Sequence, residues 1–125
     1  MRIKNTEKLI SHGNVEGRKV VCSILEEGLQ AADPYYNTKK LVKVENGKLT
    51  IGCKDFEPID SPRTGDDIYD LKDIDRIFVF GAGKGIQRVG KALEEVLGEH
   101  LTGGHVIAKH GDELILEKIK VTDGA

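Results

Sequence analysis

The apolar positions of the first third of the chain predict two helices. Thr6 is positioned to cap a short helix over residues 7–11, and Asn14 to cap a longer one. Pro34 ends the longer helix, because the residue before a proline is pushed out of helical torsions. One apolar stripe at helical spacing runs along it, and we expect this stripe to be core rather than a partner groove. Its members are Val21, Ile24, Leu25, Leu29 and Ala32.

A hairpin and an acidic stretch follow. Residues 35–38 are predicted to form a loop or a single turn. The alternating segments 41–45 and 48–51 flank Asn46-Gly47, and this arrangement is a strong hairpin signal. Residues 54–73 contain six aspartates together with prolines and a glycine. They lack the ligand spacing and terminal glutamate of a calcium-binding EF-hand, so we interpret them as a surface loop.

The second half of the chain predicts a parallel sheet. Four apolar residues in a row, Ile77 to Phe80, indicate a strand that is covered on both faces. A glycine-rich turn follows, and then apolar residues at helical spacing predict a helix from residue 84 or 85 to 97. The pattern predicts the next parallel strand at 105–109, with Gly103-Gly104 as the turn before it, and a third strand nearer an edge at 117–121. The predicted fold is a three-layer α/β core with a separate hairpin and an N-terminal helix.

The glycine turn is a candidate anion site. A strand, a glycine turn and a helix together aim backbone N–H groups at an anion, with the positive end of the helix dipole behind them. Lys84 adds a positive charge at the mouth of the turn. The alternative is a tight connection whose glycines only meet backbone torsion demands, and the pattern alone does not separate the two.

Two well-known glycine motifs do not fit this turn. A P-loop requires glycine at position 78 and Ser or Thr at position 85, where this chain has Phe78 and Gly85. A dinucleotide fingerprint requires a glycine in place of Ile86 and an acidic residue at the end of the next strand. That strand ends in Lys109 and His110 instead. Neither cofactor class is therefore indicated by the motifs.

His110 is a further candidate because of its position. It follows the predicted strand that neighbours the one leading to the glycine turn, and open parallel sheets bind ligands outside such strand ends. A single histidine is also often structural, and no Ser or Cys nucleophile pattern surrounds this one. The candidate phosphate- or substrate-binding residues are therefore Gly81, Ala82, Gly83, Gly85 and His110.

Composition narrows the classes of function. The chain has 125 residues, which suits one domain. Its 19 basic and 21 acidic residues nearly balance, so charge gives no case for nucleic acid or a membrane surface. There is no apolar run near the roughly 20 residues of a membrane helix, and no signal-peptide core. Cys22 and Cys53 lack metal-ligand spacing and are expected as thiols rather than a disulfide. We expect a cytoplasmic protein and predict no metal-ligating residues.

Three segments resemble the N-terminal region of glycerate 2-kinases. These kinases are the type also labelled hydroxypyruvate reductase, which carries a MOFRL domain at the C-terminus. The segments are residues 27–34 (EGLQAADP), 77–84 (IFVFGAGK) and 106–111 (VIAKHG). Their order and spacing agree across nearly the whole chain, and the Gly-Ala-Gly-Lys turn is the most specific part.

The resemblance implies an activity and a site. It implies ATP-dependent phosphorylation of D-glycerate on its 2-hydroxyl to give 2-phosphoglycerate, with Mg²⁺ as cofactor. It implies a Rossmann-like α/β/α domain whose active site lies in a cleft shared with a second domain that this chain lacks. The turn lysine is functional in that family and corresponds to Lys84, the implied catalytic residue. Phosphoryl transfer needs positioned positive charge more than covalent help, which suits a lysine.

The chain also departs from the family pattern. Gly85 stands where a small alanine is usual, and Arg88 stands where small residues are usual, so Arg88 inherits no role. The acidic stretch looks longer than usual. The chain stops near where the family continues into a Gly-His-Pro segment. We therefore interpret it as a fragment, a truncated product or a separate domain, and expect it to be inactive alone.

The leading hypothesis is the N-terminal part of a glycerate 2-kinase. A second is a stand-alone phosphate- or nucleotide-binding module without turnover. A third is a structural domain whose hairpin and helix serve assembly. A fourth, hydroxypyruvate reductase, is disfavoured by the incomplete dinucleotide fingerprint.

Overall fold

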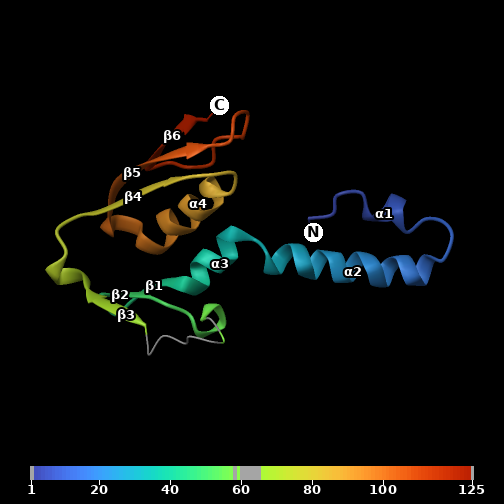
Figure 1. Cartoon of the computed structure of the whole chain (residues 1–125), viewed down its shortest axis with the longest axis horizontal. Helices are drawn as coiled ribbons and strands as arrows, with labels where there is room; N and C mark the ends of the chain where they lie inside the picture. The colour runs from blue at the N-terminus through green and yellow to red at the C-terminus, as the bar shows by residue number, and fades with distance from the viewer. Residues whose placement is uncertain (1, 58, 60–65, 125) are drawn as a thin grey trace. The chain divides into compact units, whose positions relative to one another are not determined.

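The computed structural model describes residues 2–57, 59 and 66–124. The chain divides into two compact units, Met1–Asp33 and Pro34–Ala125. The first unit is helical, and the second contains two three-stranded sheets with their helices (Figure 1). The expectation of one domain or a fragment stays a prediction.

Two helices form the first unit. Helix α1 spans Thr6–Leu9 and helix α2 spans Val15–Ala31. The prediction that Asn14 caps α2 is confirmed, since its Oδ1 accepts the N–H of Gly17 at 3.0 Å. The predicted cap by Thr6 is wrong. Thr6 is the first residue of α1, and its hydroxyl donates back to the carbonyl of Ile3 at 2.8 Å.

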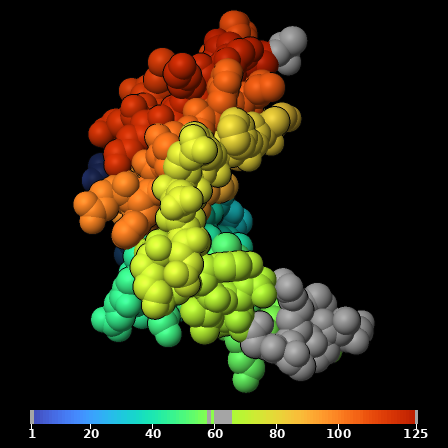
Figure 2. All heavy atoms as spheres, turned by 90° about the vertical axis from the view of Figure 1, so that its left-hand side faces the viewer, coloured from blue at the N-terminus to red at the C-terminus, as the bar shows by residue number. Residues whose placement is uncertain are grey.

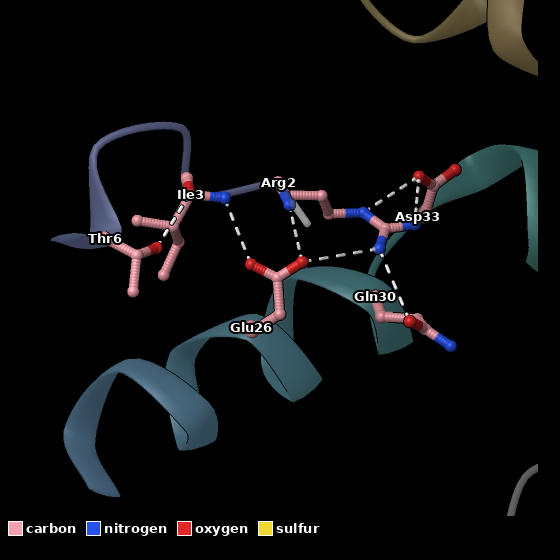
Figure 3. A network of polar contacts seen from close by, with 6 residues as sticks. All are labelled: Arg2, Ile3, Thr6, Glu26, Gln30 and Asp33. Carbon is pink, nitrogen blue, oxygen red and sulfur yellow. Dashed lines mark hydrogen bonds and ion pairs between the residues drawn. The ribbon is translucent and has the colours of Figure 1, made fainter. Parts of the chain in front are cut away.

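A polar network holds the N-terminal segment against α2 (Figure 3). The Glu26 carboxylate accepts the backbone N–H groups of Arg2 and Ile3, at 2.5 and 3.0 Å. The Arg2 guanidinium donates to the carboxylate of Asp33 at 2.9 Å, just beyond the end of α2. Asp33 is buried, so its pairing with arginine offsets the cost of removing a carboxylate from water.

The apolar stripe of α2 is not core, contrary to the prediction. Ile24 is 66% exposed, and no residue of α2 is buried. Within this unit the partner helix α1 has only four residues and is mostly polar, so it provides little apolar surface to cover the stripe. Helical spacing shows that these apolar residues share one face of α2, but it does not show whether another element covers that face.

The second unit begins with a helix and an antiparallel sheet. Helix α3 spans Pro34–Leu41, where a loop was predicted. Proline suits the first turn of a helix, whose N–H groups have no intrahelical partner. Strands β1 (Val42–Glu45), β2 (Lys48–Ile51) and β3 (Asp67–Asp70) then pair in that order. The predicted hairpin is confirmed, with positive φ at Asn46 (51°) and Gly47 (74°).

The acidic stretch is more structured than a loop. It contains the short 3₁₀ helices η1 (Lys54–Phe56) and η2 (Leu71–Asp73), with β3 between them. Pro58 and residues 60–65 lie outside the described residues. Leu71 is buried, which anchors the end of the stretch to the core. In Figure 2 the yellow segment around the start of β4 links the green first sheet to the orange and red second sheet.

The second sheet is parallel, as predicted. Its strands β4 (Ile77–Ala82), β5 (Leu101–Ala108) and β6 (Ile119–Asp123) lie in that order, apart from the hairpin sheet. Helix α4 (Ile86–Leu97) and the short η3 (Gly98–His100) connect β4 to β5. The predicted turn at Gly103-Gly104 is wrong, since both residues lie within β5.

Helix α4 packs on one face of the parallel sheet and also contacts β1. The buried core between them draws on both sheets and comprises Leu49, Leu71, Leu97, Leu101, Val106 and Ile119. The opposite face of the parallel sheet is open in the described structure, where Phe80 is 75% exposed and Phe78 and Ile107 about half exposed. The prediction that β4 is covered on both faces is therefore wrong. The protein is α/β with a parallel sheet, and a third layer is not seen.

Candidate functional site

The predicted site residues gather at one edge of the parallel sheet. Parallel strands end at the same edge, and here Ala82 pairs with Ile107 and Ala108 with Asp123. The N–H of Gly83 donates to the carbonyl of Ile107 at 3.0 Å, which ties the start of the glycine turn to β5. The glycine turn after β4 and the segment after β5 therefore lie together where the strands of the sheet end. We call the carboxyl ends of β4, β5 and β6 the ligand edge.

The glycine turn itself is shorter than predicted. Gly81 and Ala82 are the last residues of β4, so the turn consists of residues 83–85. Gly83 has φ of 139°, a conformation that favours glycine. Gly85 is the N-cap of α4 and has no side chain to satisfy the first amides of the helix. The N–H groups of Lys84 and Gly85 have no backbone acceptor within the described part of the chain, which leaves them available to an anion.

Lys84 lies at the mouth of this turn, between β4 and α4. Its side chain is exposed, and it makes no ion pair with any other described residue. An ammonium group in this position adds a full positive charge to the partial charge at the start of α4. The arrangement suits a phosphate group, because donors and charge lie together at one helix end.

Within α4, Lys91 forms an ion pair on the surface, and the Arg88 guanidinium lies over the Tyr35 ring, 5.7 Å from its centroid. The Nζ of Lys91 lies 3.2 Å from Oε1 of Glu117, and hydrogen bonding to Glu117 raises the pKa of Lys91. Glu95 accepts from the Tyr35 hydroxyl and from Lys39, at 3.0 Å for the lysine. The hydrogen bond from Tyr35, and to a smaller extent that from Lys39, lowers the pKa of Glu95. The bonds of Tyr35 and Lys39 to Glu95 therefore fix α3 to α4.

His110 follows β5 and is directed toward the end of β6. Its Nδ1 lies 3.2 Å from Oδ2 of Asp123, and its side chain is 78% exposed. Lys109 and Asp112 make a looser pair beside it, with 4.0 Å between Nζ and Oδ1. The predicted association of His110 with the ligand edge is thus consistent with its position, while its proposed contact with a ligand stays a prediction.

Sequence reasoning missed two buried polar residues of α4. Gln87 and Glu94 of α4 are buried, and both hold the connection between β5 and β6. The Gln87 side-chain oxygen accepts the N–H of Ile115 at 3.1 Å. The Glu94 carboxylate accepts three consecutive backbone N–H groups, those of residues 117–119, at 2.6–3.1 Å. The available signal was helical spacing, which puts Gln87 and Glu94 on the same helix face as the buried Gly90.

Among the described residues, no three His, Cys, Asp or Glu side chains come together as metal ligands. In the same part of the chain, no helix combines the length and apolar character that crossing a membrane requires. Cys22 and Cys53 are free and partly buried, which confirms the prediction of thiols.

Comparisons with known proteins support the resemblance in outline. Residues 20–125 match the model of a family described as a domain of unknown function, DUF4147. A glycerate 2-kinase from Pyrococcus horikoshii is 26% identical over 106 residues, which cover 85% of this chain and 20% of that relative. This chain thus spans about a fifth of the relative's length. No solved structure matches it significantly. The family model covers far more than half of the residues, and the chain belongs to the DUF4147 family.

Proposed function

We propose that this chain is the nucleotide-phosphate-binding part of a glycerate 2-kinase. The observation that carries the proposal is the glycine turn, with free amides and an exposed Lys84, at the ligand edge of a parallel sheet. The similarity of the chain to a protein named glycerate 2-kinase, over nearly its whole length, supports the same assignment. The substrates would be ATP and D-glycerate, and the product 2-phosphoglycerate.

The proposed division of labour follows from the positions of the donors. The amides of Lys84 and Gly85 would bind phosphate oxygens, and the Lys84 ammonium would stabilise negative charge that increases in the transition state. Gly83 permits the turn that exposes these amides. Gly81 and Ala82 would position the turn as the end of β4 instead of contacting phosphate. Catalysis of this kind depends on positioning and electrostatics, since the protein forms no covalent bond to the phosphoryl group.

The described residues contain no group of side chains that could hold Mg²⁺ by themselves. No cluster of carboxylates faces the glycine turn there, so the residues present do not fit a Mg²⁺ site of their own. Mg²⁺ in such proteins is often held mainly by the substrate phosphates and water, with one or two carboxylates. We therefore propose ATP and Mg²⁺ as the cofactors and assign no residue of this chain to the metal.

The proposed fold is Rossmann-like. The β4–α4–β5 unit is a parallel crossover of the kind from which such folds are built, and its glycine turn is where they bind phosphate. A second helical layer over Phe78, Phe80 and Ile107 would complete a three-layer arrangement and remove their apolar side chains from water. The proposed compartment is the cytoplasm.

The test is an assay of the full-length protein that contains this chain. We expect ADP release with ATP and D-glycerate, and no NADH oxidation with hydroxypyruvate. NADH oxidation without ADP release would support the reductase instead. If neither reaction occurs, the kinase proposal fails. In that case phosphate-induced shifts of the amide signals of residues 83–85 would support a binding module without turnover.

A further inference from the structure

A histidine and an aspartate form a pair where β5 and β6 end, at the ligand edge. Asp123 is the last residue of β6, and His110 lies two residues after the end of the adjacent strand β5. Their side chains meet with 3.2 Å between Nδ1 and Oδ2. The backbone beneath them is tied by the N–H of Gly124, which donates to the carbonyl of Ala108 at 2.7 Å. The pair therefore lies just beyond the last paired residues of the two strands, Ala108 and Asp123.

The pairing defines which nitrogen of His110 carries the proton. An ionised carboxylate can only accept hydrogen bonds, so Nδ1 must be the protonated nitrogen when it donates to Asp123. The neutral ring then has its lone pair on Nε2, on the opposite side from Asp123. A base that accepts a proton from a substrate needs such a free nitrogen, and a carboxylate behind it favours the imidazolium that forms.

The pair lies at the same edge of the parallel sheet as the glycine turn. Strand β5 lies between β4 and β6, and neighbouring strands are about 4.8 Å apart. The segment that carries His110 therefore lies between the turn of Lys84 and the end of β6. The other charged groups beside it are Lys109 and Asp112, which pair loosely with each other. A hydroxyl that attacks a phosphoryl group bound at the turn would approach this same edge.

We propose that His110 is the proton acceptor for the hydroxyl that is phosphorylated, and that Asp123 is its positioning residue. The inference rests on the proposed kinase function. The acceptor oxygen forms a bond to the γ-phosphorus of ATP as the bond from that phosphorus to the bridging oxygen breaks, which releases ADP. The hydroxyl proton passes to Nε2 of His110, and Asp123 stabilises the resulting imidazolium. The proton then leaves to water, which restores the neutral ring.

A neighbouring pair in the same strands provides the control. His105 and Thr122 also join β5 to β6, with 2.7 Å between Nε2 and the hydroxyl oxygen. A hydroxyl can both donate and accept, so this pair does not fix a tautomer. It also lies within the strands and not beyond their ends. Thr122→Ala therefore removes a histidine partner of the same strand pair without affecting the proposed base.

The first experiment reads the tautomer of His110 directly, in the unmodified protein and then in three variants. Nitrogen-15 NMR of the neutral imidazole of His110 should show a protonated Nδ1 and an unprotonated Nε2. In Asp123→Ala this preference should be lost, and in Asp123→Asn it should persist, because the amide oxygen still accepts. In Thr122→Ala it should be unchanged. A protonated Nε2 at His110 in the unmodified protein would overturn the proposal.

The second experiment measures kinase kinetics in the full-length protein. His110→Gln should lower kcat about 100-fold or more, the usual contribution of a general base, with KM for ATP nearly unchanged. Asp123→Asn should lower kcat at least tenfold although the tautomer persists, because the charge behind the ring is lost. Thr122→Ala should retain normal kcat.

The two experiments separate the proton-accepting role of His110 from the proposed kinase function. Normal kcat in His110→Gln, with an active unmodified enzyme, would refute the base while the proposed function stands. An unmodified protein without kinase activity would refute the proposed function and the proton-accepting role together. In that case the tautomer would still report whether Asp123 orients His110.

Discussion

At the scale of single residues, Gly104 determines how closely β4 and β5 approach. A Cβ atom added to it would lie 2.2 Å from the carbonyl oxygen of Val79, a backbone atom that cannot move without moving β4. The glycine turn follows β4 directly, so its position depends on this contact. Gly103, one residue earlier, has no atom within 4 Å of an added Cβ and gives a matched comparison.

Gly104→Ala should therefore destabilise the second unit, by about 1–3 kcal/mol as for other overpacked positions. That change corresponds to a fall in melting temperature of at least about 5 °C. Gly103→Ala should change stability by less than about 0.5 kcal/mol. Thermal unfolding followed by circular dichroism measures both. Equal melting temperatures for the two variants would show that the close approach of β4 and β5 is not a constraint on stability.

At the scale of elements, the N-terminal segment is held to α2 by a carboxylate. The backbone N–H groups of Arg2 and then Ile3 donate to Glu26 and lower the pKa of its carboxyl. A lowered folded-state pKa gives stabilisation that is present above the unfolded pKa of 4.5. This stabilisation is lost as pH falls through the folded-state pKa. The segment before α1 should therefore detach on acidification.

The corresponding prediction concerns a titration from about pH 6 to about pH 3. The amide signal of Ile3 should move toward its unstructured position across this range, because protonated Glu26 no longer accepts as a carboxylate. In Glu26→Gln the signal should have little pH dependence. Glu27→Gln, which removes the neighbouring carboxyl, should behave like the unmodified protein. An Ile3 signal that is insensitive to pH would contradict the role given to Glu26.

Much of the element order could be predicted from local signals. The cap at Asn14 and the Asn46-Gly47 hairpin follow from short-range chemistry. The parallel pairing of β4 with β5 follows from the order of strand, helix and strand. Helix α3 was missed because Pro34 was interpreted only as the end of α2 and not as the first residue of a new helix. The pattern also could not reveal that β3 joins the hairpin, because strand pairing depends on residues far apart in sequence.

The candidate site was predictable only in part. The glycine turn and His110 were located from their places after predicted strands, and the structure puts them at one edge. The buried side chains of Gln87 and Glu94 were not identified, since their partners are backbone amides more than 20 residues away. Asp123 was missed for a similar reason, because its approach to His110 depends on the register of β5 and β6.

At the scale of the whole molecule, each unit has an apolar face open to solvent. In the first unit it is the stripe of α2, and in the second it is the sheet face that carries Phe78 and Phe80. The sequence predicted both segments as core, because periodicity reports which residues avoid water but not what covers them. In the proposed function, phosphate binding depends on the order of strand, glycine turn and helix, and on the charge at Lys84.

Turnover of the full-length protein with Lys84→Ala is the most direct test of the kinase account. The ammonium acts on charge that develops in the transition state, so its loss should lower kcat about 100- to 1,000-fold. Lys72→Ala removes an exposed lysine that pairs with Asp70 near the other sheet, and it should have normal kcat. A coupled assay of ADP release with ATP and D-glycerate measures all three proteins. Near-normal kcat in Lys84→Ala would contradict the central claim, that the glycine turn and its lysine hold the transferring phosphate.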